Sequence, residues 1–514
     1  MRNLINVFGV TLLAAVFFFA CSEDRYMGDY EYLNSDTKVS VTFDKEAIVS
    51  LEQATNVAKA FLGGEIAKKG GAKSLANASV EAVKDNSNNL SMYIINYPEG
   101  GWVIVGATQN YYPVLAYNDE GRFEIKPEAE MGGALLWLEE TKEAVRVSAA
   151  FADTTKAQMR NAWKVYEAND KKIPSGSGAK NYQIMYARME QLAAIYGGSS
   201  GAAGGGWNTY NTLQSMQGLL QYNEYQNLLY YAQMFGSDPD LTIVAMKDQY
   251  YTTTNVGPLL TTQWHQDAPF NASVQLVVDN NGNLVRAKAG CVAVAIAQIM
   301  KYHKYSYNFN FSFNWNLMPD IGQNTNPATH HTPDFIYDVG QAADTNYGYD
   351  ESYSTDQNAY NVLKNTHGYD VGNSNNPDDH DVAKVRTNIL AKRPVYVSGQ
   401  IGNNPNDPGH AWVCDGVRDS HVDKIYFIEF FTGSGYSDNG FITPSYPGSI
   451  HQSSNTHFHL NWGESPAVTG GYNANGWYIN NSFPYGASNF SFKRKNIYVK
   501  CGKHSNTNPC NNCK

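Results

Sequence analysis

The chain has 514 residues, of which 42% are hydrophobic and 17% charged, and its formal net charge is −10. This length predicts two or three domains, and the hydrophobic content together with 36 tyrosines favours an exported, β-rich protein over a disordered one. The negative charge and the lack of any Lys/Arg run argue against a nucleic-acid-binding protein.

The N-terminus is predicted to be a signal peptide covering residues 1–20. Its sequence, MRNLINVFGVTLLAAVFFFA, places one arginine before an apolar run that is short for a stable membrane span. With Cys21, the ending resembles a bacterial lipobox, in which the signal is cleaved before a cysteine that then receives lipid. This resemblance implies a lipoprotein anchored to the membrane through Cys21. An ordinary signal peptide that leaves Cys21 free is the alternative.

Three regions follow before the main domain. Residues 21–45 are polar and rich in Tyr and Asp, which predicts a tether. Residues 46–190 predict a small α+β domain: SLEQATNVAKAFLGG has helical spacing, and SMYIINYPEGGWVIVGAT and YYPVLAYNDEGRFEI are strand-like with turns between them. Residues 191–246 contain GGSSGAAGGG, which predicts a flexible linker and activation region open to proteases, although a helical segment near 210–235 follows it.

Residues 247–500 are predicted to be one larger domain, which begins with a helix at Cys291. In GCVAVAIAQIMKYH the apolar residues recur every three to four positions, and Cys291 falls in the first turn. There, free backbone N–H groups favour a thiolate. A cysteine before an apolar helix can equally be a core residue, so this pattern leaves both interpretations open.

A histidine that could serve as a base occurs in PNDPGHAWVCDGV, where a polar loop delivers His410 to the start of an alternating strand. His303 lies 12 residues after Cys291 in the same helix, about 18 Å along the axis, and is too distant to act on the thiol. A structural histidine remains the other interpretation of His410 at this point.

Four blocks in order resemble the streptopain-like cysteine peptidases, bacterial relatives of papain. They are LLTTQWHQDAPFN at 259–271, GCVAVAIAQIMKYH at 290–303, GHAWVCDG at 409–416 and HLNWG at 459–463. Residues 46–190 resemble the inhibitory propeptide of these enzymes, chiefly in GGWVIVGATQNYYPVLAY. The resemblance implies an α+β, papain-like fold with a helical half and an antiparallel β half, preceded by a small α+β prodomain.

The resemblance also implies roles for individual residues. Cys291 matches the nucleophile, His410 the general base, and Gln266 the glutamine that holds the oxyanion together with the backbone N–H of Cys291. Gln263 is a rival for that role. Trp462 matches a tryptophan that shields the histidine, and Asn461 is expected to orient the imidazole, although both could serve strand packing alone.

The sequence departs from the family pattern at two places, and it contains further cysteines outside the expected active site. Glu464 replaces a second tryptophan of the family, and about 30 residues are inserted between Gly416 and His459, so substrate specificity is open. Cys414, in mid-strand, is expected to pack in a core. The tail 501–514, with Cys501, His504, Cys510 and Cys513, has the spacing of a zinc site, but a disulfide plus a free thiol, or a disordered tail, is favoured because exported proteins are exposed to oxidation.

The sequence therefore predicts a secreted or surface-anchored cysteine endopeptidase made as a zymogen. Its expected partners are protein or peptide substrates, its own propeptide as an intramolecular inhibitor, and a membrane, reached through Cys21 at the bacterial outer membrane or cell surface unless processing releases the enzyme. No metal or organic cofactor is required, and no nucleic acid is bound. Two alternatives remain: an inactive surface-binding lipoprotein on this scaffold, or a thiol acyltransferase or amidase.

Overall fold

The computed structural model describes a subset of the chain: residues 44–61, 75–125, 128–164, 166, 184–185, 187–189, 191–192, 211–217, 222–304, 314–322, 331–372, 374–400, 409–433, 435–436, 441–442, 451–464, 473–480 and 492–501. The predicted signal peptide, Cys21, nearly all of the tether, and the tail beyond Cys501 lie outside these residues. Within the described part, no helix has the length and apolar character needed to cross a bilayer.

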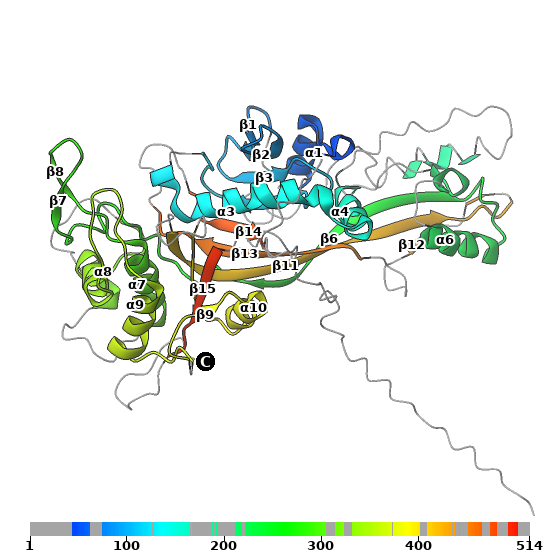
Figure 1. The fold of residues 1–514 in the computed structure, drawn as a ribbon. Helices are drawn as coiled ribbons and strands as arrows, with labels where there is room; N and C mark the ends of the chain where they lie inside the picture. The colour runs from blue at the N-terminus through cyan, green and yellow to red at the C-terminus, as the bar shows by residue number, and fades with distance from the viewer. Residues whose placement is uncertain are drawn as a thin grey trace, which may run out of the picture. The chain divides into compact units, whose positions relative to one another are not determined.

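An antiparallel sheet dominates the structure (Figure 1). Its main path runs, in spatial order, through β1 (Ser79–Lys84), β2 (Leu90–Asn96), β3 (Trp102–Gly106), β4 (Val114–Asn118), β14 (Gly476–Ile479), β13 (His451–Asn461), β11 (Gly409–Glu429), β10 (Val395–Gln400), β15 (Phe492–Tyr498) and β9 (Asp378–Asp379). Off this path, β11 also pairs with β12 (Phe441–Ile442) and β6 (Ile243–Val256), and β6 pairs with β5 (Asn211–Thr212). A separate hairpin joins β7 (Leu276–Val278) and β8 (Leu284–Arg286).

The helices fall into three groups along the chain. The first lies in the N-terminal third of the chain and comprises η1 (Lys45–Ala47), α1 (Leu51–Phe61), α3 (Glu128–Val147), η3 (Ser148–Ala150) and α4 (Asp153–Lys164). The second comprises η4 (Gln214–Met216) and α6 (Tyr222–Met234). The third comprises α7 (Cys291–His303), η5 (Trp315–Leu317), α8 (His331–Ala342), α9 (Asp356–Asn361), η7 (Val362–Thr366) and α10 (Val382–Leu390).

The N-terminal α+β region forms around β2 and β3, whose apolar residues are almost all buried. The helix α1 buries Ala54, Val57 and Ala58 against this sheet, as its spacing predicted. The sheet then continues into the C-terminal half, because β4 pairs with β14 at Tyr117–Trp477 and Ala116–Tyr478. One continuous sheet therefore joins the two predicted domains.

The helix α7 lies in the middle of a large apolar core and begins at Cys291. Gly290 before it has φ +91, a conformation that side chains rarely adopt, so the glycine is needed for backbone geometry at the helix start. Ten of its 13 residues are buried, among them Val292, Ile296 and Met300. The helical half thus holds Cys291 at the end of a rigid, apolar element.

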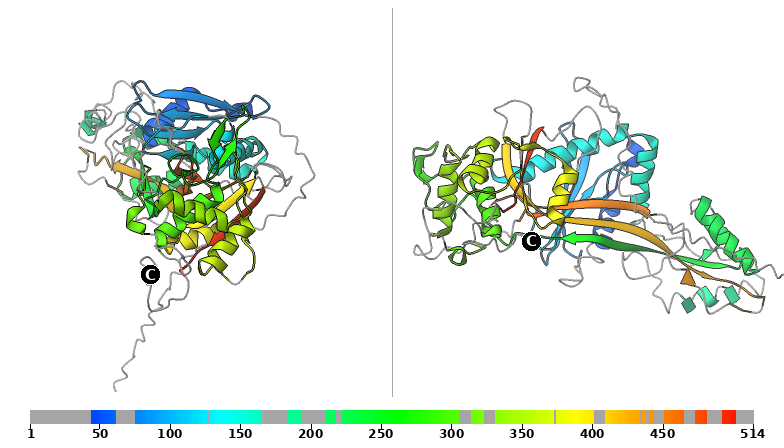
Figure 2. Two further views of the ribbon diagram at one scale, coloured as in Figure 1. Left: turned by 90° about the vertical axis from the view of Figure 1, so that its left-hand side faces the viewer. Right: turned by 90° about the horizontal axis from the view of Figure 1, so that it is seen from below.

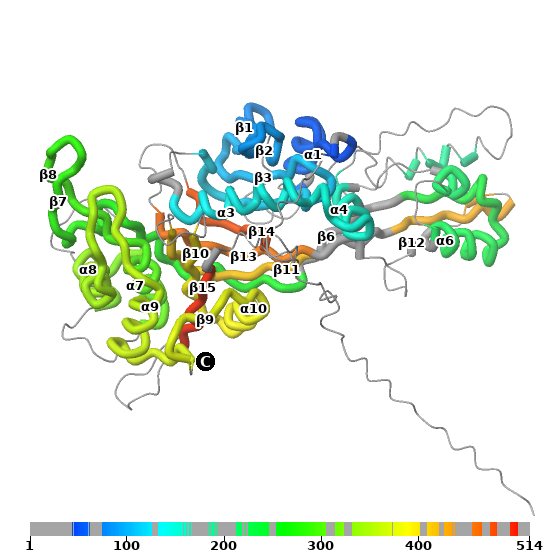
Figure 3. The backbone as a smooth tube through the Cα atoms, viewed as in Figure 1, coloured from blue at the N-terminus to red at the C-terminus, as the bar shows by residue number. Residues whose placement is uncertain are grey.

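The region 191–246 is more ordered than the linker expected from the sequence. Where described, it forms η4, α6 and the start of β6, and β6 pairs with β11 through thirteen residue pairs from Val417–Val256 to Glu429–Ile243. The two strands form one long ribbon, which the tube in Figure 3 and the right view of Figure 2 make easy to follow. Near its far end a small core buries Leu213, Met216 and Leu228. The GGSSGAAGGG segment itself lies outside the described residues.

This ordering has a physical reason that lies far away in the sequence. The insertion after Gly416 supplies the second half of β11, which pairs with β6, and Ile428 and Phe430 join the core that α6 covers. Arg188 reinforces the same end, because its Nη2 lies 2.7 Å from Oε1 of the buried Glu429. The apolar residues of α6 are thus buried by a partner that local sequence could not reveal.

Candidate active site

Cys291 is partly exposed at the first turn of α7 and is a free cysteine. The backbone N–H groups of Ala411 and Val292 lie close enough to its thiol to favour the thiolate and lower its pKa. Ala411 directly follows His410 on β11, so the contact places the thiol against the start of the strand that carries the expected base. The two halves of the fold therefore meet at the predicted nucleophile.

The thiol is not ionised in this arrangement. Burial raises the pKa of Cys291 to about 11, and the opposing effect of the Ala411 and Val292 N–H groups is smaller. The sequence pattern indicated a thiolate at this helix start. The difference arises because desolvation disfavours the charged form more strongly than the helix terminus favours it here.

His410 is buried at the beginning of β11, and its imidazole is held by a backbone carbonyl. Its Nε2 lies 2.8 Å from the carbonyl oxygen of Trp462. Because a carbonyl only accepts, Nε2 carries the proton and donates it, which in the neutral ring leaves Nδ1 as the basic nitrogen. The His410 ring also stacks on Trp412, with centroids 6.4 Å apart and planes 14° apart.

Trp462 and Asn461 lie at the end of β13, but they contact different parts of the site. The Trp462 ring is buried beside Trp412, with centroids 5.1 Å apart, and its carbonyl oxygen holds His410. The Asn461 side chain bonds instead to Thr262, Gln298 and Gly463, and these bonds use both donors and both lone pairs of its amide. Asn461 thus braces the loop before Gln266, and its expected role at the imidazole stays a prediction.

Gln266 lies next to the start of α7. Its backbone carbonyl accepts the N–H of Ala289 at 2.9 Å, two residues before Cys291, and the neighbouring Asp267 pairs with Lys288 at 2.6 Å. The backbone of Gln263 is tied elsewhere, to the carbonyl of Asp320 at 2.7 Å. Gln266 is therefore better placed than Gln263 to serve an oxyanion near the thiol, and this role also stays a prediction.

The helix α3 covers the His410 side of this site. It is kinked at Gly132, which has φ 44° and ψ −123°. A Cβ at Gly133 would lie 2.4 Å from Cε3 of Trp462 and 2.7 Å from Cδ2 of His410, and one at Gly132 would lie 2.2 Å from Oε1 of Glu464. Only glycines allow this backbone to approach the rings so closely, and the approach leaves no room for a substrate over His410.

Glu464 faces the same kink. Its Oε1 lies 3.7 Å from Nε2 of His410, and burial raises its pKa to about 8. The charge of His410 and the backbone N–H groups of Gly133 and Ala134 oppose that shift. Those N–H groups begin the straight part of α3, where a helix attracts negative charge. The residue that departs from the family pattern therefore also contacts the N-terminal domain.

The remaining described cysteines take no part in this site. Cys414 is buried on β11, and burial raises its pKa well above the ordinary value, as expected of a core thiol. Cys501 is disulfide-bonded, which favours the disulfide interpretation of the tail over zinc. Its bonding partner lies outside the described residues.

Three contributions to the site were missed by sequence reasoning. The Gly132–Gly133 pair and Glu140 of α3 contact the C-terminal half, where Arg494 of β15 forms an ion pair with Glu140. The paired glycines inside a helical stretch were a usable signal, because glycine in a helix interior is unfavourable unless something must approach closely. Glu140 and Arg494 carried no such local signal.

Two family models match parts of the chain and agree with this organisation. Residues 264–478 match the model of the Peptidase C10 family, and residues 46–145 match that of the Spi protease inhibitor. No curated protein sequence matches the chain. Among solved structures, prointerpain A of Prevotella intermedia is 16% identical, with a TM-score of 0.42, and the similarity covers 83% of this chain and 100% of that one. The active wild-type interpain A cysteine protease is 20% identical, with a TM-score of 0.31, covering 48% of this chain and 95% of that one.

The family matches confirm the streptopain-like resemblance, the α+β fold class and an inhibitor domain that acts within the chain. Neither an inactive binding lipoprotein nor an acyltransferase gains support from them. The chain thus contains a segment that matches the Peptidase C10 family and, ahead of it, one that matches the Spi protease inhibitor, and together these matches support a cysteine peptidase made as a zymogen.

Proposed function

We propose that the mature protein is an endopeptidase of streptopain-like specificity in which Cys291, His410 and Gln266 carry the chemistry. The observation that supports this most directly is the approach of the Ala411 N–H to the Cys291 thiol, because it brings the helix of the nucleophile against the strand of the base. In the released enzyme, Nδ1 of His410 takes the thiol proton, and the thiolate attacks the peptide carbonyl.

The remaining steps follow from the same three residues. The amide N–H of Gln266 and the backbone N–H of Cys291 hold the oxyanion, and His410 returns its proton to the leaving amine as the C–N bond breaks. Water then attacks the thioester with His410 as base, which releases the carboxylic acid and restores the thiol. Trp462 shields the imidazole from solvent and fixes Nε2 through its carbonyl oxygen.

The test uses peptides blocked at both ends, which only an endopeptidase can cleave, alongside casein. We expect cleavage by the mature enzyme, none by the Cys291→Ala variant, and a loss of about 10²–10³ in kcat for Gln266→Ala. Gln263→Ala is the matched control and should stay near wild type. Cleavage only of peptides with a free terminus would reject the endopeptidase assignment, and full activity of Gln266→Ala would reject its role.

We further propose that the protein is exported and held on the membrane by lipid on Cys21. The support is the sequence alone: a short apolar run that ends at a cysteine in a lipobox-like setting. Cells fed an alkyne-tagged fatty acid should label the wild-type protein and not the Cys21→Ala variant, which should leave the membrane fraction. Equal labelling of both proteins would contradict the anchor.

A further inference from the structure

A small cavity of about 40 Å³ lies in the interface between α3 and the peptidase sheet. The inhibitor domain contributes Trp137 to its wall, and the peptidase half contributes Trp412, Cys414 and Arg494 among others. Most of the lining is apolar, but two N–H donors there are buried without a hydrogen-bond partner: Nε1 of Trp412 and Nε of Arg494. Unpaired buried donors are uncommon, so this wall is short of an acceptor.

One acceptor in this wall is Glu140 of α3, which pairs with Nη2 of Arg494 and leaves Nε of Arg494 and Nε1 of Trp412 unpaired. The Oε2 of Glu140 contacts Nη2 of Arg494 in a buried ion pair, in which the side chains are only 7% and 11% exposed. Burial raises the pKa of Glu140, and Arg494 opposes that shift. The guanidinium also lies over the Trp412 ring, 5.7 Å from its centroid. One face of Arg494 is therefore satisfied by a carboxylate that belongs to the inhibitor domain.

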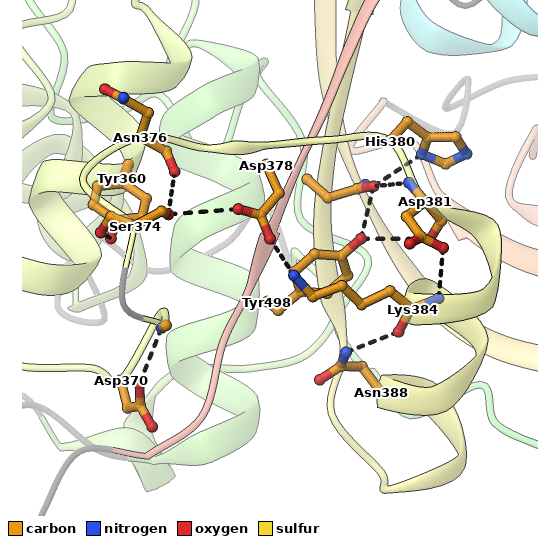
Figure 4. Close-up of polar contacts among 12 residues, drawn as sticks. Tyr360, Asp370, Ser374, Asn376, Asp378, His380, Asp381, Lys384, Asn388 and Tyr498 are labelled. Atoms are coloured by element: carbon orange, nitrogen blue, oxygen red, sulfur yellow. Dashed lines mark hydrogen bonds and ion pairs between the residues drawn. The ribbon is translucent and has the colours of Figure 1, made fainter.

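The backbone at Arg494 is held by the peptidase half, because its carbonyl accepts the N–H of His380 at 3.2 Å. Two residues further along β15, the side-chain oxygen of Asn496 accepts the N–H of Asp381 at 3.2 Å and the Tyr498 hydroxyl at 3.2 Å, and pairs with Nδ1 of His380 at 3.0 Å. Figure 4 shows these three labelled residues converging beside α10. Because this network contains no inhibitor-domain residue, the backbone of β15 at Arg494 is held without Glu140.

The spacing of contacts along α3 indicates how far the cavity lies from the expected base, His410. The Trp412 ring stacks on His410, and the Arg494 guanidinium lies over the same ring. Along α3, Gly133 lies against His410 and Glu140 against Arg494, and seven helical residues span about 10 Å. An extended peptide covers that length in about three residues. Because His410 must protonate the leaving amine, the substrate residues on its side of the cleft are those that follow the scissile bond.

We propose that Arg494 and Trp412 form a substrate subsite of the mature peptidase that binds an acidic side chain about three residues after the scissile bond, and that Glu140 of the inhibitor domain fills this subsite in the zymogen. The proposal rests on the peptidase function above. When α3 leaves, Arg494 loses its carboxylate, and a substrate glutamate replaces it with a charge-assisted, bidentate contact. A purely structural ion pair would give the mature enzyme no preference for acidic substrates.

The experiment compares mature enzymes made from the wild-type zymogen and from a Glu140→Gln/Arg494→Gln zymogen, in which neither buried charge is left alone. The substrates are blocked peptides with Glu or Gln at each of the first four positions after one cleavable bond. We expect wild type to favour Glu over Gln about tenfold in kcat/KM near the third position. The variant should lose that preference, so that its kcat/KM values for the Glu and Gln peptides become equal.

Two further variants make the result specific to this site. Arg494→Lys keeps the positive charge but lacks the bidentate geometry of the guanidinium, and it should retain part of the preference. Arg386→Gln removes an arginine from a different carboxylate pair, 2.6 Å from Asp419, and should leave the preference unchanged. Equal cleavage of Glu and Gln peptides by wild type, or an equal loss on both in Arg494→Gln, would overturn the subsite. Failure of wild type to cleave any peptide while Cys291 still reacts with iodoacetamide would overturn the peptidase function itself.

Discussion

The two ends of the contact between α3 and the peptidase half use different chemistry. At Gly132 and Gly133, bare backbone lies against His410 and Trp462, and α3 offers no side chain at all. Seven residues further along, Glu140 offers a buried carboxylate to Arg494. The first end blocks the base through shape, whereas the second holds the domain through charge. Blocking and holding are therefore separable, and each can be broken without the other.

The glycine end should give the largest effect. In Gly133→Val the new side chain must displace the Trp462 or His410 ring, so α3 lifts from the site and the Cys291 thiol becomes solvated. A pKa near 11 leaves roughly one thiol in ten thousand ionised at pH 7, so restoring an ordinary thiol should speed alkylation by about 10²–10³. The measurement is the rate of iodoacetamide labelling of Cys291 in the intact zymogen.

Gly435→Ala is the control, because a Cβ there meets nothing within 4 Å. Its labelling rate should match wild type. An unchanged rate in Gly133→Val would mean that the glycine approach is not what shields the thiol.

Loss of the ion pair at the charged end of the contact should give the second largest effect. Glu140→Gln leaves the Arg494 charge buried without a carboxylate, which costs about 3 kcal/mol. Cys291 should become reactive at a lower urea concentration, with the labelling rate in buffer less affected than in Gly133→Val. Pairing the change with Arg494→Gln should restore much of the loss. If the double variant is as weak as the single one, the ion pair does not act as a unit.

The pH dependence sharpens the comparison, because Glu464 lies at the glycine end. Its pKa is about 8 in the zymogen and near 4.5 for a solvated carboxyl, so the docked state binds the proton more tightly. Docking is therefore strongest below about 4.5 and weakens as the pH rises towards 8. We expect the urea concentration at the midpoint of Cys291 labelling to decrease as the pH is raised from 5 to 8. The decrease should be smaller in Glu464→Gln. An identical pH profile in both proteins would exclude Glu464 as a cause.

A neutral contact outside both ends should give the smallest effect. Nδ2 of Asn118 donates to the carbonyl of Asn475 at 2.5 Å, across the two halves of the sheet. Asn118→Ala removes one partly buried hydrogen bond, worth about 1 kcal/mol. The urea midpoint should shift by less than half of the shift seen in Glu140→Gln. A larger shift would mean that the sheet junction, and not α3, supplies most of the docking energy.

Local sequence was sufficient to predict the elements that carry the chemistry. The apolar spacing after Cys291 gave the helix and its first residue, and the loop before Gly409 gave the start of the strand with His410. These predictions succeed because a helix start and a strand start depend on neighbouring residues. The resemblance to a known family supplied what spacing could not, namely that these elements meet.

Local sequence could not reveal the contacts between residues hundreds of positions apart. Glu140 and Arg494 are separated by 354 residues, and neither is unusual among its neighbours. The raised pKa of Cys291 was unexpected for the same reason, because it depends on burial within the folded zymogen. The order within 211–246 depends on pairing of β6 with the inserted part of β11, which no local pattern announces.

The pairing of β4 with β14 has a further consequence for the life of the enzyme. Trp477 and Tyr478 bond along the backbone to a strand of the inhibitor domain, so loss of that domain turns β14 into an open sheet margin. Such a margin offers unpaired N–H and C=O groups to any extended chain, including another copy of the enzyme. Maturation thus creates an unpaired edge strand as well as a free cleft. By pairing with β14, the inhibitor domain also protects the enzyme against self-association.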